Sequence, residues 1–214
     1  MGLTRRLRAR LAAEGGFTLP ELLVTMAILL IVVASLASVL VQASKSEIDA
    51  NKRFTAQVQD RTALDKVRRE LHCASSVTVT DALGNPLSVG TAGSAITTQL
   101  SSVCPSTLGQ TLYVTWCTSQ STLNTSDWAL YRVTSAASPP TCASSGKIKW
   151  ADYLTTSTPF CLPSSSVACS GVLRPTASLP MLHVRLPVDI NGPSSTLDKY
   201  KLIDDIALRN GTRS

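Results

Sequence analysis

The sequence predicts an α+β fold in which one long N-terminal helix packs its second half on an antiparallel β-sheet. Three observations support this prediction. Residues 22–44 are uncharged and mostly apolar, residues 45–73 carry apolar side chains at helical spacing, and short β-like runs separated by turn residues follow Ala74. The chain of 214 residues is long enough for one domain of ordinary size with an attached segment.

The first 16 residues form a basic leader. Four arginines against one glutamate give this leader a net charge of +3, half of the chain's formal +6. The overall basicity therefore does not by itself indicate nucleic-acid binding. The charged residues of the leader are Arg5, Arg6, Arg8, Arg10 and Glu14.

The apolar stretch predicts a membrane anchor. As a helix, residues 22–44 are about 35 Å long, which is enough to span a hydrocarbon core of about 30 Å. The preceding arginines hold the N-terminus in the cytoplasm and place the rest of the chain outside, as a single-pass membrane protein. A secretory signal with a cleavage site near residues 35–37 is the alternative, but this apolar run is longer than a usual signal core. The anchor is predicted to include Leu22, Leu23, Val24, Ile28, Leu29, Leu30, Ile31, Val32 and Val33.

Glu21 places a carboxylate at the start of this apolar run, where a charge costs several kcal/mol unless it is paired. Thr18 and Glu21 have the spacing of a capping box, with Pro20 in the first turn. Capping contributes only about 1 kcal/mol. Glu21 is therefore predicted to pair with a positive group as well.

The stretch GGFTLPELLVTMAILLIVV resembles the N-terminal signature of type IV pilins and type II secretion pseudopilins. In that family a membrane-embedded peptidase cleaves after the glycine, here Gly16, and the new N-terminus, here Phe17, is methylated. The glutamate at the fifth mature position, here Glu21, is carried by nearly all members that assemble. The resemblance covers about residues 1–45, with Pro20 in place of the commoner aliphatic residue. It implies that the α-amine of Phe17, in the same chain or a neighbour, is the partner of Glu21.

The resemblance implies a structural subunit precursor with a pilin-like fold. Its expected partners are the prepilin peptidase and methylase, other pilin or pseudopilin subunits, the inner-membrane assembly platform and membrane lipid. The expected product is a type IV pilus-like or type II secretion filament, at the surface or in the periplasm, in which this chain is a minor subunit. The stem-and-head plan, the arginines before Cys73 and the chain length also resemble J-type pseudopilins and W-type minor pilins.

The predicted organisation has four parts: a leader (1–16), a transmembrane and assembly helix (17–44), an amphipathic helical half (45–73) and an extracytoplasmic head (74–214). One helix is expected from Leu19 to His72, because neither Gly nor Pro occurs between Glu21 and Gly84. Its second half should pack on the head through a stripe of apolar residues. The members of this stripe are Ile48, Phe54, Val58, Leu64, Val67 and Leu71.

The head is predicted to be an antiparallel sheet with long Ser/Thr-rich loops. Between residues 74 and 180, 37 of 107 residues are Ser or Thr and seven are charged, which suits a secreted surface. A last segment, 199–210, is a strand or a short helix. The other predicted strands are 76–80, 111–118, 128–134, 147–154 and 181–190.

All six cysteines lie in or beside the head, and their even number predicts up to three disulfides in an oxidising compartment. The nearest-neighbour pairs Cys161–Cys169 and Cys104–Cys117 are favoured, and Cys73 is a candidate to fasten the helix to the sheet. Free buried thiols are the alternative for these residues and for Cys142.

No catalytic constellation, cofactor site or metal site is predicted, and His72 and His183 are interpreted as structural. A calcium site formed by Asp204 and Asp205 with Asp189 or Asp198 is a less favoured alternative, because the spacing fits no EF-hand loop. The basic residues of the helix alternate with acidic ones, so a salt-bridged surface is preferred to a nucleic-acid or lipid site. Two other functions stay open: a membrane-anchored secreted enzyme or binding module, and a DNA-binding minor pilin for competence.

Overall fold

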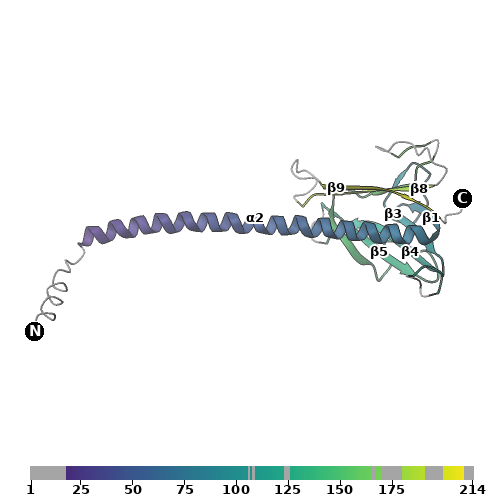
Figure 1. Cartoon of the computed structure of the whole chain (residues 1–214), viewed down its shortest axis with the longest axis horizontal. Coiled ribbons are helices and arrows are strands. Elements are labelled where there is room, and N and C mark those ends of the chain that lie inside the picture. The colour runs from purple at the N-terminus through teal and green to yellow at the C-terminus, as the bar shows by residue number, and fades with distance from the viewer. Residues whose placement is uncertain are drawn as a thin grey trace, which may run out of the picture. The chain divides into compact units, whose positions relative to one another are not determined.

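The computed structural model describes residues 18–105, 107, 109–122, 126–164, 167–169, 180–190 and 200–209. The chain divides into two compact units, residues 1–50 and residues 51–214. The long helix α2 (Leu19–Cys73) begins in the first unit and ends in the second (Figure 1). The predicted continuous helix is therefore confirmed. Gly16 and Phe17 lie outside the described residues.

The part of α2 in the second unit buries one face. Leu64, Val67 and Leu71 belong to this face, as predicted, but Ile48, Phe54 and Val58 are exposed. Ile48 and Phe54 precede Ala56, the first buried residue of the helix, and Val58 lies on the side of the helix turned away from Ala56 and Asp60. The buried face comprises Ala56, Asp60, Ala63, Leu64, Val67, Glu70 and Leu71.

The strands form one sheet in which every pairing is antiparallel. Their order is β1-β3-β4-β5-β6-β8-β7-β2, and β9 pairs with β8. The strands are β1 (Ala74–Thr80), β2 (Ala92–Gly93), β3 (Ala95–Leu100), β4 (Leu112–Gln120), β5 (Trp128–Ser135), β6 (Ile148–Leu154), β7 (Phe160–Cys161), β8 (Met181–Val188) and β9 (Tyr200–Ala207).

All six predicted strands are present, and the last one is a strand and not a helix. The prediction missed the two-residue strands β2 and β7, and it missed β3, whose sequence AITTQL has few apolar residues. This strand is stabilised by ladders on both sides, to β1 and to β4, and those pairings are long-range.

The core lies between the sheet and the buried face of α2. Trp116 and Phe160 are its largest fully buried side chains, and they belong to one cluster with Val67 and Leu71 of the helix. The ring of Trp116 also meets that of Trp150 edge-on, with centroids 5.6 Å apart. The other face of the sheet carries a smaller cluster that contains Cys117, Tyr131 and Cys142.

Two disulfides are formed, Cys117–Cys142 and Cys161–Cys169. The second was predicted from sequence. The predicted pair Cys104–Cys117 is wrong, because Cys104 lies in the core on the helix side whereas Cys117 lies in the small cluster on the other face. Cys73 and Cys104 are free thiols.

We expect the Cys117–Cys142 disulfide to contribute more stability than the other one. It closes 25 residues and the other closes 8, so unfolded-chain entropy predicts a loss of about 3.5 kcal/mol for the Cys117→Ser/Cys142→Ser variant and about 2.5 kcal/mol for Cys161→Ser/Cys169→Ser. Urea unfolding of each full chain in detergent, followed by tryptophan fluorescence, measures both losses. A larger loss for the shorter loop would contradict this order.

Candidate functional site

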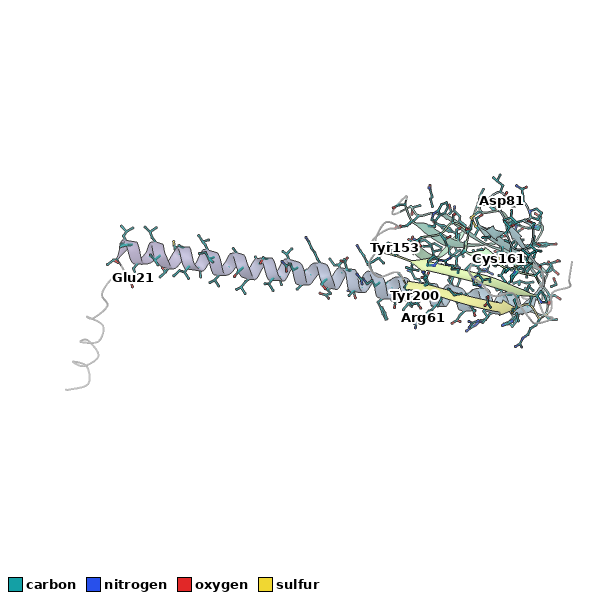
Figure 2. All side chains as sticks on the ribbon, turned by 90° about the horizontal axis from the view of Figure 1, so that it is seen from above. Glu21, Arg61, Asp81, Tyr153, Cys161 and Tyr200 are labelled. Carbon is teal, nitrogen blue, oxygen red and sulfur yellow. A yellow bond between two sulfur atoms is a disulfide. The ribbon has the colours of Figure 1, made fainter. Side chains whose placement is uncertain are left out.

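The start of α2 carries the predicted assembly residue. Thr18 directly precedes the helix, and its carbonyl oxygen accepts a hydrogen bond from the Leu22 amide at 3.2 Å. Glu21 lies exposed in the first turn (Figure 2). Within the described chain, the Glu21 carboxylate has no hydrogen-bond or ion-pair partner, so the side-chain bonds of the predicted capping box are not formed there. The carboxylate is free to accept another partner.

The apolar stretch that follows is uncovered on every side. Side chains project from both sides of the ribbon along this part of α2 (Figure 2). The nine predicted anchor residues are between 46% and 70% exposed. The helix is long and apolar enough to cross a membrane. An apolar surface of this extent marks a site of contact with lipid or with other subunits.

Three hydroxyl side chains in this stretch are satisfied within the helix. The hydroxyls of Thr25, Ser35 and Ser38 each donate to a backbone carbonyl three residues earlier, at 2.7–2.9 Å. Such internal hydrogen bonds lower the cost of placing a hydroxyl in hydrocarbon. The whole segment after Glu21 is thus compatible with a bilayer or with a bundle of apolar helices.

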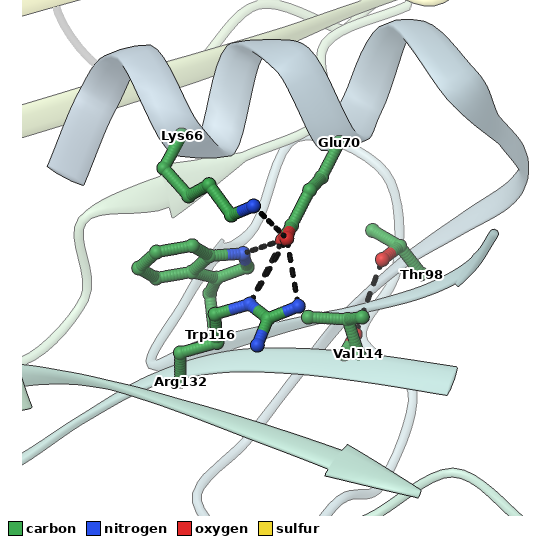
Figure 3. A network of polar contacts seen from close by, with 6 residues as sticks. All are labelled: Lys66, Glu70, Thr98, Val114, Trp116 and Arg132. Atoms are coloured by element: carbon green, nitrogen blue, oxygen red, sulfur yellow. Dashed lines mark hydrogen bonds and ion pairs between the residues drawn. The ribbon is translucent and has the colours of Figure 1, made fainter. Parts of the chain in front are cut away.

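A buried carboxylate joins the second part of α2 to the sheet. The Glu70 side chain is 2% exposed and accepts a hydrogen bond from Trp116 Nε1 of β4 at 2.8 Å (Figure 3). The Arg132 guanidinium of β5 lies 2.8 Å from the Glu70 carboxylate, and Lys66 Nζ lies 3.4 Å from it. Three donors therefore satisfy one buried charge, as burial requires.

Sequence reasoning counted Glu70 among the solvated charges and missed this role. The available signal was its position on the helix, since Glu70 is three residues from Val67 and next to Leu71 on the buried face. Lys66 is four residues away, but the partners on the sheet are 46 and 62 residues away in the sequence. They could not be identified without the strand arrangement.

Asp60 is the second buried acid of the helix, and it has no hydrogen-bond partner for either carboxylate oxygen among the described residues. Burial raises the pKa of Asp60 from 3.8 to about 8, and the negative charge of Asp152 on β6 adds to the increase. Asp152 itself is held by Lys149 at 2.7 Å. Asp60 is therefore protonated at neutral pH.

Asp204 and Asp205, which the sequence offered as calcium ligands, contact different basic side chains. Asp204 accepts from Arg68 at 2.7 Å, and Asp205 lies 2.7 Å from His183 Nδ1. These contacts attach β9 to α2 and to β8, and they give His183 the structural role expected. The described residues contain no group of three or more side chains suited to a metal ion, and Asp198 lies outside them.

The basic residues near the end of α2 are largely paired. Arg68 contacts Asp65 as well as Asp204, and Lys66 contacts Glu70. Arg61 donates to the Tyr200 hydroxyl at 3.3 Å. This arrangement agrees with the predicted salt-bridged surface.

The described features define an α+β protein whose apolar helix fits a membrane anchor. Residues 11–37 match the family model described as the prokaryotic N-terminal methylation motif. The matched range contains Gly16, Phe17 and Glu21, and it supports a type IV pilin-like prepilin whose N-terminus is processed. The chain matches no curated protein and no solved structure.

Proposed function

We propose that the chain is a precursor that is cleaved after Gly16, methylated at Phe17 and assembled as a minor pilin or pseudopilin. The filament is type IV pilus-like or belongs to type II secretion, and the chain resembles J-type pseudopilins and W-type minor pilins. The observation that carries the proposal is the methylation motif on residues 11–37. The unpartnered Glu21 and the uncovered apolar helix support it.

Assembly follows from two physical requirements. The apolar half of α2 must be covered, first by lipid and then by the corresponding helices of neighbouring subunits, which pack side by side. Glu21 must be paired as it leaves water. The α-amine of Phe17 on a neighbouring subunit supplies a positive charge that exists only after cleavage.

The topology follows from the charges of the leader. Four arginines before the apolar segment keep the N-terminus in the cytoplasm and direct the head outward. Two disulfides in the head support this orientation, since they persist in oxidising compartments. We propose a structural role without catalysis, because the buried polar residues Glu70 and His183 make structural contacts.

We expect Glu21→Ala to be cleaved like the wild type but to assemble poorly. A lost charge-assisted contact of about 1.5–3 kcal/mol lowers an association constant roughly tenfold or more. Mass spectrometry of the membrane-bound protein, from cells that contain the prepilin peptidase, measures loss of residues 1–16. The sheared filament fraction measures assembly. Glu47→Ala, an exposed acid beyond the apolar segment, is the matched control.

Two results would contradict this division of roles. An intact N-terminus on the wild-type chain in such cells would favour the membrane-anchored enzyme or binding module. Failure of Glu21→Ala at cleavage, with normal assembly of the fraction that is cleaved, would assign Glu21 to recognition by the peptidase.

A further inference from the structure

The two free cysteines lie together at the point where α2 ends. Cys73 is the last residue of the helix, and Cys104 belongs to the connection between β3 and β4. The Cys104 Sγ donates to the carbonyl oxygen of Cys73 at 3.3 Å. Burial, together with the neighbouring Cys73 thiol, raises the pKa of Cys104 to about 11. The two side chains are therefore neighbours although 31 residues separate them.

We propose that Cys73 and Cys104 form a third disulfide, which fastens the C-terminal end of α2 to the β3–β4 connection. The other four cysteines are already paired with each other. The environment that oxidises those pairs acts on this one too, because all six residues belong to the same unit. The inference goes beyond the proposed function and does not depend on N-terminal processing.

The two thiols differ in accessibility, and this difference sets the order of reaction. Cys104 is 3% exposed, whereas Cys73 is half-buried. A cavity of about 560 Å³ opens beside the pair, with Cys73 and Pro105 in its wall. Its remaining lining residues are Lys66, Arg69, Glu70 and His72. A small disulfide oxidant, including an anionic one such as oxidised glutathione, can reach Cys73 through this opening.

The reaction is a thiol–disulfide exchange in two steps. The Cys73 thiolate attacks one sulfur of the oxidant, which is a disulfide compound or a disulfide oxidoreductase, and releases the other sulfur as a thiol. The Cys104 thiolate then attacks the Cys73 sulfur of this mixed disulfide and releases the second thiol of the oxidant. The protein loses two protons and two electrons, and one oxidant disulfide becomes two thiols.

The consequence is a covalent link at the end of the helix. The end of α2 is already continuous with β1, which begins at Ala74 directly after Cys73. A disulfide at Cys73 adds a second covalent connection, which ties the junction of α2 and β1 to the segment between β3 and β4. It also closes a loop of 31 residues in the unfolded chain.

The test uses the full chain in detergent, purified with both native disulfides intact, and then treated with oxidised glutathione. One sample is alkylated with iodoacetamide before treatment and a second sample is alkylated after it, so that each alkylated cysteine marks a free thiol. The protein is then digested with proteases. Cutting before Asp65 and Asp81 places Cys73 on its own peptide, and cutting after Tyr113 separates Cys104 from Cys117. We expect the two alkylated sites to disappear and a Cys73–Cys104 cross-linked peptide to appear, with an increase in the thermal unfolding midpoint.

The variants Cys73→Ser and Cys104→Ser each retain one thiol and provide the control. We expect Cys73→Ser to react slowly, since its remaining thiol is buried, and Cys104→Ser to stop at the glutathione mixed disulfide. Neither variant should gain thermal stability on oxidation. Alkylation of both Cys73 and Cys104 in the fully treated wild type would overturn the proposal, and so would pairing of either with Cys117 or Cys142.

Discussion

Replacing Asp60 by asparagine is expected to stabilise the second unit, by on the order of 4 kcal/mol near pH 7. The buried carboxyl has no hydrogen-bond partner among the described residues, and its pKa rises from 3.8 to about 8 on folding. Asparagine has nearly the same shape and carries no ionisable group. The variant therefore removes the cost of keeping this acid protonated in the folded state.

The sign of the effect follows from the direction of the pKa shift. A raised pKa in the folded state means that the folded chain binds the proton more tightly than the unfolded chain. The contribution of this proton to the free energy of unfolding is complete below pH 3.8 and is lost as the pH rises through about 8. The wild type should therefore lose about 1.4 kcal/mol per pH unit across this window, relative to Asp60→Asn.

Urea unfolding of the full chain in detergent between pH 5 and pH 9 measures this difference. The three tryptophans lie in β4, β5 and β6, so their fluorescence reports on the second unit. Asp65→Asn, an exposed acid on the same helix, is the matched control and should leave the pH profile unchanged. Parallel profiles for Asp60→Asn and the wild type would show that Asp60 is ionised in the folded chain.

Replacing Glu70 by alanine is expected to destabilise the second unit by about 3–5 kcal/mol. The substitution leaves Arg132, which is 14% exposed, without its counter-charge and leaves Trp116 Nε1 without its acceptor. The cost is the desolvation of these groups and not only the loss of the contacts. Asp65→Ala, which breaks an exposed ion pair, should cost less than about 1 kcal/mol.

Two further variants separate charge from hydrogen bonding at this position. Glu70→Gln keeps an acceptor for Trp116 but removes the charge. It should therefore be less stable than the wild type and more stable than Glu70→Ala. Combining Glu70→Ala with Arg132→Ala should cost less than the sum of the single losses, because the two residues share one interaction. Additive losses, or a Glu70→Ala loss no larger than that of Asp65→Ala, would argue against the buried ion pair.

Local patterns in the sequence were sufficient for the helix and most of the sheet. The absence of Gly and Pro over residues 22–83 predicted one continuous helix, and alternating residues between turn signals predicted the six longer strands. The prediction failed at β3, because its stability comes from two neighbouring strands and not from its own residues. It also failed at Ile48 and Phe54, which precede the covered part of the helix, and at Val58, which lies on the uncovered face.

The sequence by itself determined the N-terminal features: a basic leader, a match to the prokaryotic N-terminal methylation motif, and Glu21 at the start of an apolar helix. These features are readable because they depend on residues close together in the chain. Tertiary structure alone decided the pairing of Cys117 with Cys142 and the roles of Glu70 and Asp60. Those depend on which face of the sheet a residue occupies and which distant strand lies beside it. Burial then turns an ordinary surface acid into a paired charge at Glu70 and a protonated one at Asp60.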